Sequence, residues 1–178
     1  MSLATDIDFY KKYTSDHLNE MKKYYEEHSS LDKAISNASI GKNDSNIMDP
    51  HQWLVGKVKG EIGAKELNSR IFEIKNAQSF EDIFEITESV IKKIYGLGDL
   101  WSYDTALRIG FFLRKYPKEV YIQRGVVHGV KKIFKNKIPK GRSLDVSIFP
   151  KELQQLKPYE IENFLSIWGK EENKKSNC

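Results

Sequence analysis

The chain has 178 residues and a net charge of +4, and hydrophobic residues make up 39% of it, as in an ordinary globular protein that buries a core without metal ions. Its only cysteine, Cys178, excludes an internal disulfide, and no apolar run reaches the roughly 18 residues of a membrane span. Because the N-terminal stretch also lacks an apolar signal core, we expect a cytoplasmic protein in a reducing compartment.

The positive charge is concentrated in one part of the chain. Residues 1–107 hold 13 Lys and Arg against 18 Asp and Glu, whereas residues 108–142 hold 11 against a single acid, Glu119. Concentrated positive charge repels itself unless a partner offsets it. A face that binds a polyanion explains this basic block, residues 108–142, better than a solvated basic surface does.

Helical spacing of apolar residues predicts the first elements. One or two helices are expected over residues 6–28, followed by a short helix that Ser29 or Ser30 caps. After a polar loop, Asp49 and Pro50 predict the start of another helix, since they suit the cap and the first helical position. These patterns indicate a compact all-α bundle, which we expect to form one domain over residues 1–170.

The clearest predicted helix begins at Ser79, which forms a capping box with Asp82. It is expected to end near Gly96, a C-cap residue type, after Lys92 and Lys93. The sequence Gly-Leu-Gly then breaks the helical pattern at residues 96–98. A second helix is expected to follow, with Ser102 as its cap.

The last third of the chain is predicted to be helical as well. A third helix is expected to open on Pro117 and run over residues 117–134, although its Val and Ile content leaves a strand open. A basic loop follows, and then two short helices, of which the second starts at Pro158. Residues 171–178 are expected to form a disordered tail.

The pattern of helix, Gly96-Leu97-Gly98 and helix resembles the helix-hairpin-helix motif of DNA repair and processing proteins, over about residues 79–115. Glycines turn the backbone without a Cβ in the way, and free N–H groups at a helix start bind anions. Leu97 is expected to point inward and pin the two helices together. Such a site binds phosphate and not bases, so we expect DNA binding without sequence specificity. A routine turn is the alternative.

The candidate contacts lie in this hairpin and in the basic block. They are Gly96, Leu97, Gly98, Trp101, Ser102, Arg108, Arg114, Lys115, Arg124, Lys131, Lys132 and Lys135. Trp101 and Tyr103 are expected either to stack on an unpaired base or to fill the core between helices. The expected partner is double- or single-stranded DNA, held by its phosphate backbone, with an acidic protein as the alternative partner.

Residues 117–134 also resemble, more distantly, the segment that follows the hairpin in the helix-hairpin-helix DNA glycosylases. That resemblance implies a catalytic role for Glu119, in the place of the family's aspartate. Glu119 equally suits the first turn of a helix, where an acid is favourable. The hairpin has no lysine for lyase chemistry, and no metal or cofactor motif is present, so the sequence favours a binding protein over an enzyme.

Overall fold

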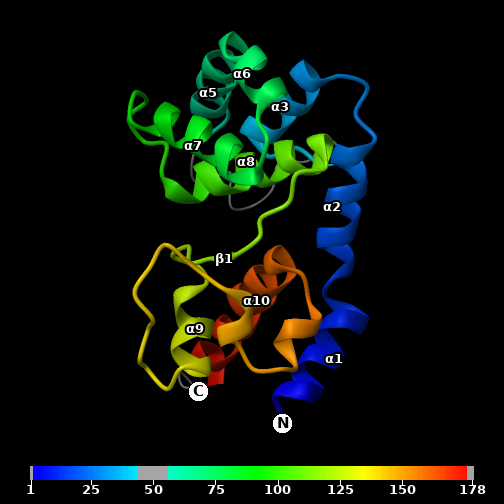
Figure 1. Ribbon diagram of the computed structural model, residues 1–178, viewed down its shortest axis with the longest axis vertical. Helices are drawn as coiled ribbons and strands as arrows, with labels where there is room; N and C mark the ends of the chain where they lie inside the picture. Colours follow the sequence, from blue (N-terminus) through cyan, green and yellow to red (C-terminus); the bar gives the residue numbers. More distant parts are fainter. Residues whose placement is uncertain (1, 44–55, 176–178) are drawn as a thin grey trace. The chain divides into compact units, whose positions relative to one another are not determined.

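The computed structural model describes residues 2–43 and 56–175 of the chain. Helices account for most of these residues, as the all-α prediction requires, and a two-stranded antiparallel ribbon accompanies them. The contacts divide the chain into two compact units (Figure 1). Unit 1 comprises Met1–Leu18 and Lys118–Cys178, and unit 2 comprises Asn19–Pro117. A single domain over residues 1–170 stays a prediction, because each unit is described by itself.

Unit 2 contains five helices among its described residues, and most of a sixth, α2, which begins just before it. The bounds are α2 (Asp16–Glu26), α3 (Leu31–Ile40), α5 (Lys57–Ser69), α6 (Ile71–Asn76), α7 (Phe80–Ile91) and α8 (Asp99–Leu113). Helix α8 packs against both α7 and α3, and α5 packs against α3 and α7. Figure 1 shows α7 and α8 as neighbouring green helices. The predicted start of a helix at Asp49 lies outside the described residues.

Helix α7 starts where the sequence predicts. The Ser79 hydroxyl accepts a hydrogen bond from the Asp82 backbone N–H, and the Asp82 carboxylate accepts one from the Ser79 N–H, which completes the capping box. Phe80, Ile83 and Val90 on one face of the helix are buried. The cap and the apolar face agree, so this is the element that local sequence determines best.

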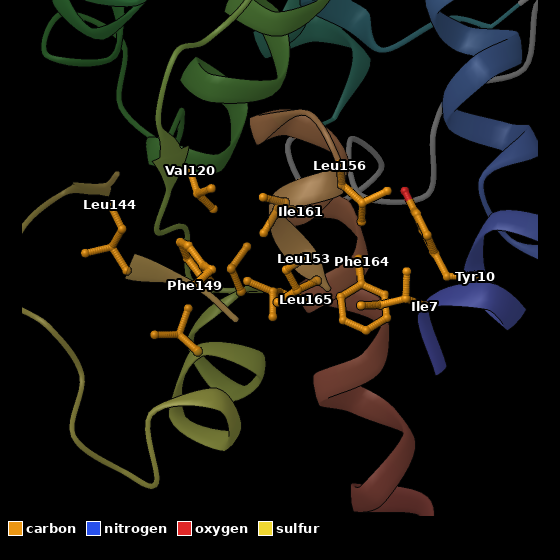
Figure 2. Close-up of a cluster of buried hydrophobic side chains, with 12 residues drawn as sticks. Ile7, Tyr10, Val120, Leu144, Phe149, Leu153, Leu156, Ile161, Phe164 and Leu165 are labelled. Atoms are coloured by element: carbon orange, nitrogen blue, oxygen red, sulfur yellow. The ribbon is translucent and has the colours of Figure 1, made fainter. Parts of the chain in front are cut away.

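Unit 1 combines an N-terminal segment with the last third of the chain. Its elements are α1 (Leu3–Tyr13), β1 (Val120–Tyr121), α9 (Val127–Ile133), β2 (Ser143–Leu144), two 3₁₀ helices η1 (Val146–Ile148) and η2 (Leu153–Gln155), and α10 (Pro158–Lys175). Figure 2 shows Ile7 and Tyr10 of α1 beside Phe164 of α10 in one apolar cluster. The Tyr10 hydroxyl donates to Asn163 at 3.0 Å, and the Trp168 indole N–H donates to Asp6 at 2.9 Å.

Helices α9 and α10 cross at two glycines. A Cβ on Gly129 would collide with the backbone carbonyl oxygen of Leu165, and one on Gly169 would lie 2.5 Å from the Gly129 nitrogen. Both positions lack room for any side chain, because the clashing atoms belong to backbone that cannot swing away. The two glycines therefore set the close approach of these helices.

The structure corrects the predicted helix over residues 117–134. Val120 and Tyr121 form strand β1, which pairs antiparallel with Leu144 and Ser143 of β2, and the helix starts only at Val127. Val120 and Tyr121 are both buried, and β-branched and aromatic residues suit such a strand. Helix α10 begins at Pro158 as predicted and continues to Lys175, into the segment expected to be a disordered tail.

Candidate nucleic-acid interface

A tight turn joins α7 to α8. The Leu97 backbone N–H donates to the Ile94 carbonyl at 3.2 Å, which closes a four-residue turn with Tyr95 and Gly96 at its centre. Gly96 has φ +90°, whereas Tyr95 is not among the residues with positive φ. Positive φ at the third residue is characteristic of a type II turn, and glycine adopts it most readily. Gly96 is thus fixed by the turn itself.

Leu97 and Gly98 connect this turn to α8. The Leu97 side chain is 7% exposed and lies inward, as predicted. Gly98 caps α8 with extended backbone, φ −127° and ψ 178°, and no side chain supplies a capping hydrogen bond. Among the residues that the structure describes, none has an atom within 4 Å of a Cβ built on Gly98. The start of α8, whose first N–H groups have no helical carbonyl partner, therefore has open space beside it.

Ser102 has a different role from the one predicted. Helix α8 begins at Asp99, so Ser102 is not its cap. Its side chain is fully buried, and its hydroxyl lies 2.9 Å from the Thr87 hydroxyl of α7. A small residue at this position lets the two hairpin helices pack closely, but it is not available to a ligand. Its burial argues against a contact with a ligand, and the assignment of Ser102 as a contact residue stays a prediction.

The two aromatic residues proposed for stacking are core residues. Trp101 is 1% exposed, and its indole N–H donates to the Ser39 carbonyl at 2.7 Å. Tyr103 is 1% exposed and packs edge-on against Phe80 and Phe84. Of the two alternatives that the sequence left open, the core is correct, so Trp101 does not contact a ligand through its ring.

Arg108 is also buried. Its side chain is 3% exposed, and its guanidinium lies 4.0 Å from the Asp104 carboxylate one turn earlier. Helix α8 is buried on nearly all sides between its neighbours, so it has no polar face. The burial indicates a structural role for Arg108, and its assignment as a phosphate contact stays a prediction.

Helix α5 lies against the hairpin and brings a cation to it. A Cβ on Gly63 would lie 2.5 Å from the Trp101 ring and 3.3 Å from Leu97, so α5 approaches both residues closely. One turn earlier, the half-buried Lys59 places its ammonium group against Gly96. Lys59 thus places a positive charge beside the backbone of the turn, and Lys92 is exposed nearby in the sequence. Asp99, an acid in the first turn of α8, is exposed as well.

The remaining predicted cations are divided between the two units. Arg114 is exposed at the C-cap of α8, and Lys115 donates to the Gln78 carbonyl at 3.2 Å. The others belong to unit 1, where Arg124, Lys131 and Lys135 are exposed. The Lys132 ammonium lies 3.6 Å from the centre of the Trp168 ring, which commits it to a cation–π contact.

The charge of unit 1 centres on the segment around α9. Between β1 and β2 the chain makes a long excursion, drawn in Figure 1 as helix α9 and a yellow loop. We call residues 135–142 the basic loop. It carries Lys135, Lys137, Lys140 and Arg142, which are all exposed, and no acid. Unit 1 has 15 Lys and Arg against 10 acids, whereas unit 2 has 14 against 15. The hairpin and most of the basic charge therefore belong to different units.

Glu119 lies in unit 1, next to strand β1. Its side chain is exposed, and its carboxylate accepts a hydrogen bond from the Ser143 hydroxyl across the β1–β2 ribbon. This bond gives Glu119 a structural role at the ribbon. A catalytic role for Glu119 stays a prediction.

One exposed residue of the hairpin escapes the sequence analysis. Tyr95, at the second position of the turn, is 98% exposed. The signal in the sequence was the position of this aromatic residue directly before Gly-Leu-Gly, where the predicted helix ends. Attention to Trp101 and Tyr103, which follow the turn, missed it.

Protein-family models, curated proteins and solved structures were compared with the chain, and none of them matches it. In the part of the chain that the structure describes, no helix has the length and apolar character needed to cross a membrane. Within the same residues, His, Cys, Asp and Glu form no group of three or more that could hold a metal ion.

Proposed function

We infer that this protein binds nucleic acid through the phosphate backbone, without sequence specificity. The observation that carries the inference is the turn at Gly96, with Leu97 buried beneath it and Gly98 open at the uncapped start of α8. Backbone N–H groups at a helix N-terminus attract a phosphate oxygen, and the helix dipole adds to that attraction. The Lys59 ammonium beside Gly96 supplies a full positive charge.

The exposed cations of unit 1 support the same function. Four of them belong to the basic loop, and Lys118, Arg124 and Lys131 add to them. Neutralised phosphates release counterions, so each contact steepens the dependence of affinity on salt. With about five phosphates neutralised on duplex DNA, log K falls against log salt with a slope of roughly −4 to −5.

The test is fluorescence anisotropy of labelled duplex and single-stranded DNA across a salt series, with variants at the two surfaces. Gly98→Asp places a carboxylate at the proposed phosphate site, while Asp is also a better helix cap than glycine, so the fold is kept. We expect Gly98→Asp to weaken binding at least about tenfold, since a carboxylate repels the phosphate and occupies the same N–H groups. Gly98→Asn offers the same cap without the charge and is expected to lose less.

A second variant separates the basic loop from the hairpin. Lys137→Gln/Lys140→Gln removes two exposed charges, so the salt slope is expected to fall by roughly 2 without any effect on folding. If Gly98→Asp binds like the wild type while the loop variant loses affinity, nucleic acid binds unit 1 alone and the hairpin is a plain turn. Absence of binding at low salt rejects the function and leaves an acidic protein as the partner to test.

A further inference from the structure

We propose that Tyr95 is a stacking platform for an unpaired nucleobase, which gives the hairpin a preference for single-stranded over duplex nucleic acid. The proposal rests on the proposed function, because the phosphate of the same nucleotide is held at the start of α8. The proposal adds a preference for single-stranded nucleic acid, since a phosphate site alone does not distinguish single strands from a duplex.

The first argument is that the folded chain gains little from a tyrosine at position 95. The second residue of a type II turn favours proline, whose fixed φ suits the turn. Here the position holds a large aromatic ring that is 98% exposed, so the ring gains almost nothing from burial in the folded chain. Burial in the folded chain therefore does not account for the tyrosine, and a ligand that stacks on the ring would cover its exposed apolar face.

The second argument is the placement of the ring relative to charge. Tyr95 immediately precedes Gly96, and the Lys59 ammonium lies against Gly96. The exposed Lys92 and Lys93 come two to three residues before Tyr95 in the sequence. Lys93 is paired with Glu66 at 2.5 Å, which leaves the half-buried Lys59 and the exposed Lys92 as cations of the turn, with Asp99 as an exposed acid at the start of α8. An aromatic face next to cations and backbone N–H groups is the combination that binds single-stranded nucleic acid.

The third argument is the geometry of a nucleotide. A single sugar joins the base to its phosphate, so a phosphate at Gly98 brings its base to the same turn, where the Tyr95 ring stands clear of the protein. In a duplex the base is already stacked between its neighbours and offers no free face. The ring therefore adds affinity only where a base is unpaired.

The experiment compares binding of two labelled oligomers: a short oligothymidylate and an oligomer of equal length whose sugars carry no bases. Tyr95→Pro removes the ring and keeps a residue that the turn favours, so the hairpin folds. We expect it to bind oligothymidylate roughly 5- to 100-fold more weakly than the wild type, and the base-free oligomer equally well. Tyr95→Phe retains a stacking face and is expected to bind like the wild type.

A direct readout comes from Tyr95→Trp. Stacking is expected to quench the fluorescence of the new indole when oligothymidylate is added and not when the base-free oligomer is added, after subtraction of the wild-type signal. Equal binding of oligothymidylate by the wild type and Tyr95→Pro, with Gly98→Asp still defective, overturns the stacking role and leaves the phosphate site in place. Failure of the wild type to bind either oligomer rejects both proposals together.

Discussion

At the scale of single residues, the glycines of this chain differ sharply in what they tolerate. Gly129 and Gly169 form the crossing of α9 and α10, where backbone atoms occupy the space of a Cβ. Gly125, in the same unit, has no atom of the described residues within 4 Å of such a Cβ, and its φ is not positive. One residue type thus has a packing role at two positions and a replaceable role at the third.

We expect Gly129→Ala to lower the free energy of unfolding by about 2 kcal/mol or more, because the new methyl group forces the two helices apart. Gly125→Ala is the matched control and is expected to change stability by less than about 0.5 kcal/mol. Urea denaturation followed by circular dichroism measures both. Equal stability of the two variants contradicts the close crossing described for Gly129.

The contrast between Trp101 and Tyr95 shows what the sequence does not reveal about single residues. Both are aromatic and flank the same Gly-Leu-Gly turn, yet one is 1% exposed and the other 98%. The difference depends on α3 and α5, since Trp101 donates to Ser39 and lies against Gly63, both distant in sequence. Tertiary neighbours of this kind leave no mark in the local pattern.

At the scale of elements, capping chemistry determines where α7 begins. The Asp82 carboxylate accepts hydrogen bonds from the backbone N–H groups of Gln78 and Ser79, at 2.7 and 3.0 Å. These bonds hold the pKa of Asp82 below its ordinary value of 3.8. Helix α8, by contrast, starts at a glycine without a side-chain cap. Side chains thus accept hydrogen bonds from the backbone N–H groups at the start of α7, whereas no side chain caps the start of α8.

The lowered pKa of Asp82 predicts that the stability of the protein depends on pH. Because the folded-state pKa of Asp82 is depressed, its stabilising effect is complete above the unfolded-state pKa and disappears as the pH falls through the folded-state value. Asp82→Asn is therefore expected to be less stable than the wild type at neutral pH, with the gap narrowing below pH 3.8. Denaturation midpoints at several pH values measure the gap. Glu81→Gln, which changes the same charge outside the capping box, is the control, and an identical profile for both variants contradicts the prediction.

Local signals identified the elements that depend on local chemistry. The capping box of Ser79 and the proline start of α10 are correct, since both involve residues within one turn. Strand β1 was left open by the sequence, which favoured a helix there, because its partner Leu144 lies far along the chain and only pairing distinguishes two buried residues from a helical turn. The inward Leu97 was predictable from the turn, whereas the position of Lys59 beside it required the packing of α5.

At the scale of the whole molecule, the basic block does not coincide with either compact unit. The basic block is continuous in sequence, yet Arg114 and Lys115 belong to unit 2 and the cations from Lys118 onward belong to unit 1. Composition alone predicted one face, because it contains no information about which compact unit a residue joins. The hairpin consequently lies in a unit of nearly balanced charge.

The composition of unit 1 has a consequence for synthesis on the ribosome. Its N-terminal helix α1 bonds to α10 through pairs 153 and 162 residues apart, Tyr10 with Asn163 and Asp6 with Trp168. All of unit 2 is translated between these partners, and domains form as units during translation. Unit 2 is therefore expected to be complete while α1 still awaits its partner. Hydrogen exchange on ribosome-bound chains that end before Pro158 should show protection of α7 and α8 but not of α1, and protection of α1 in such chains would contradict this expectation.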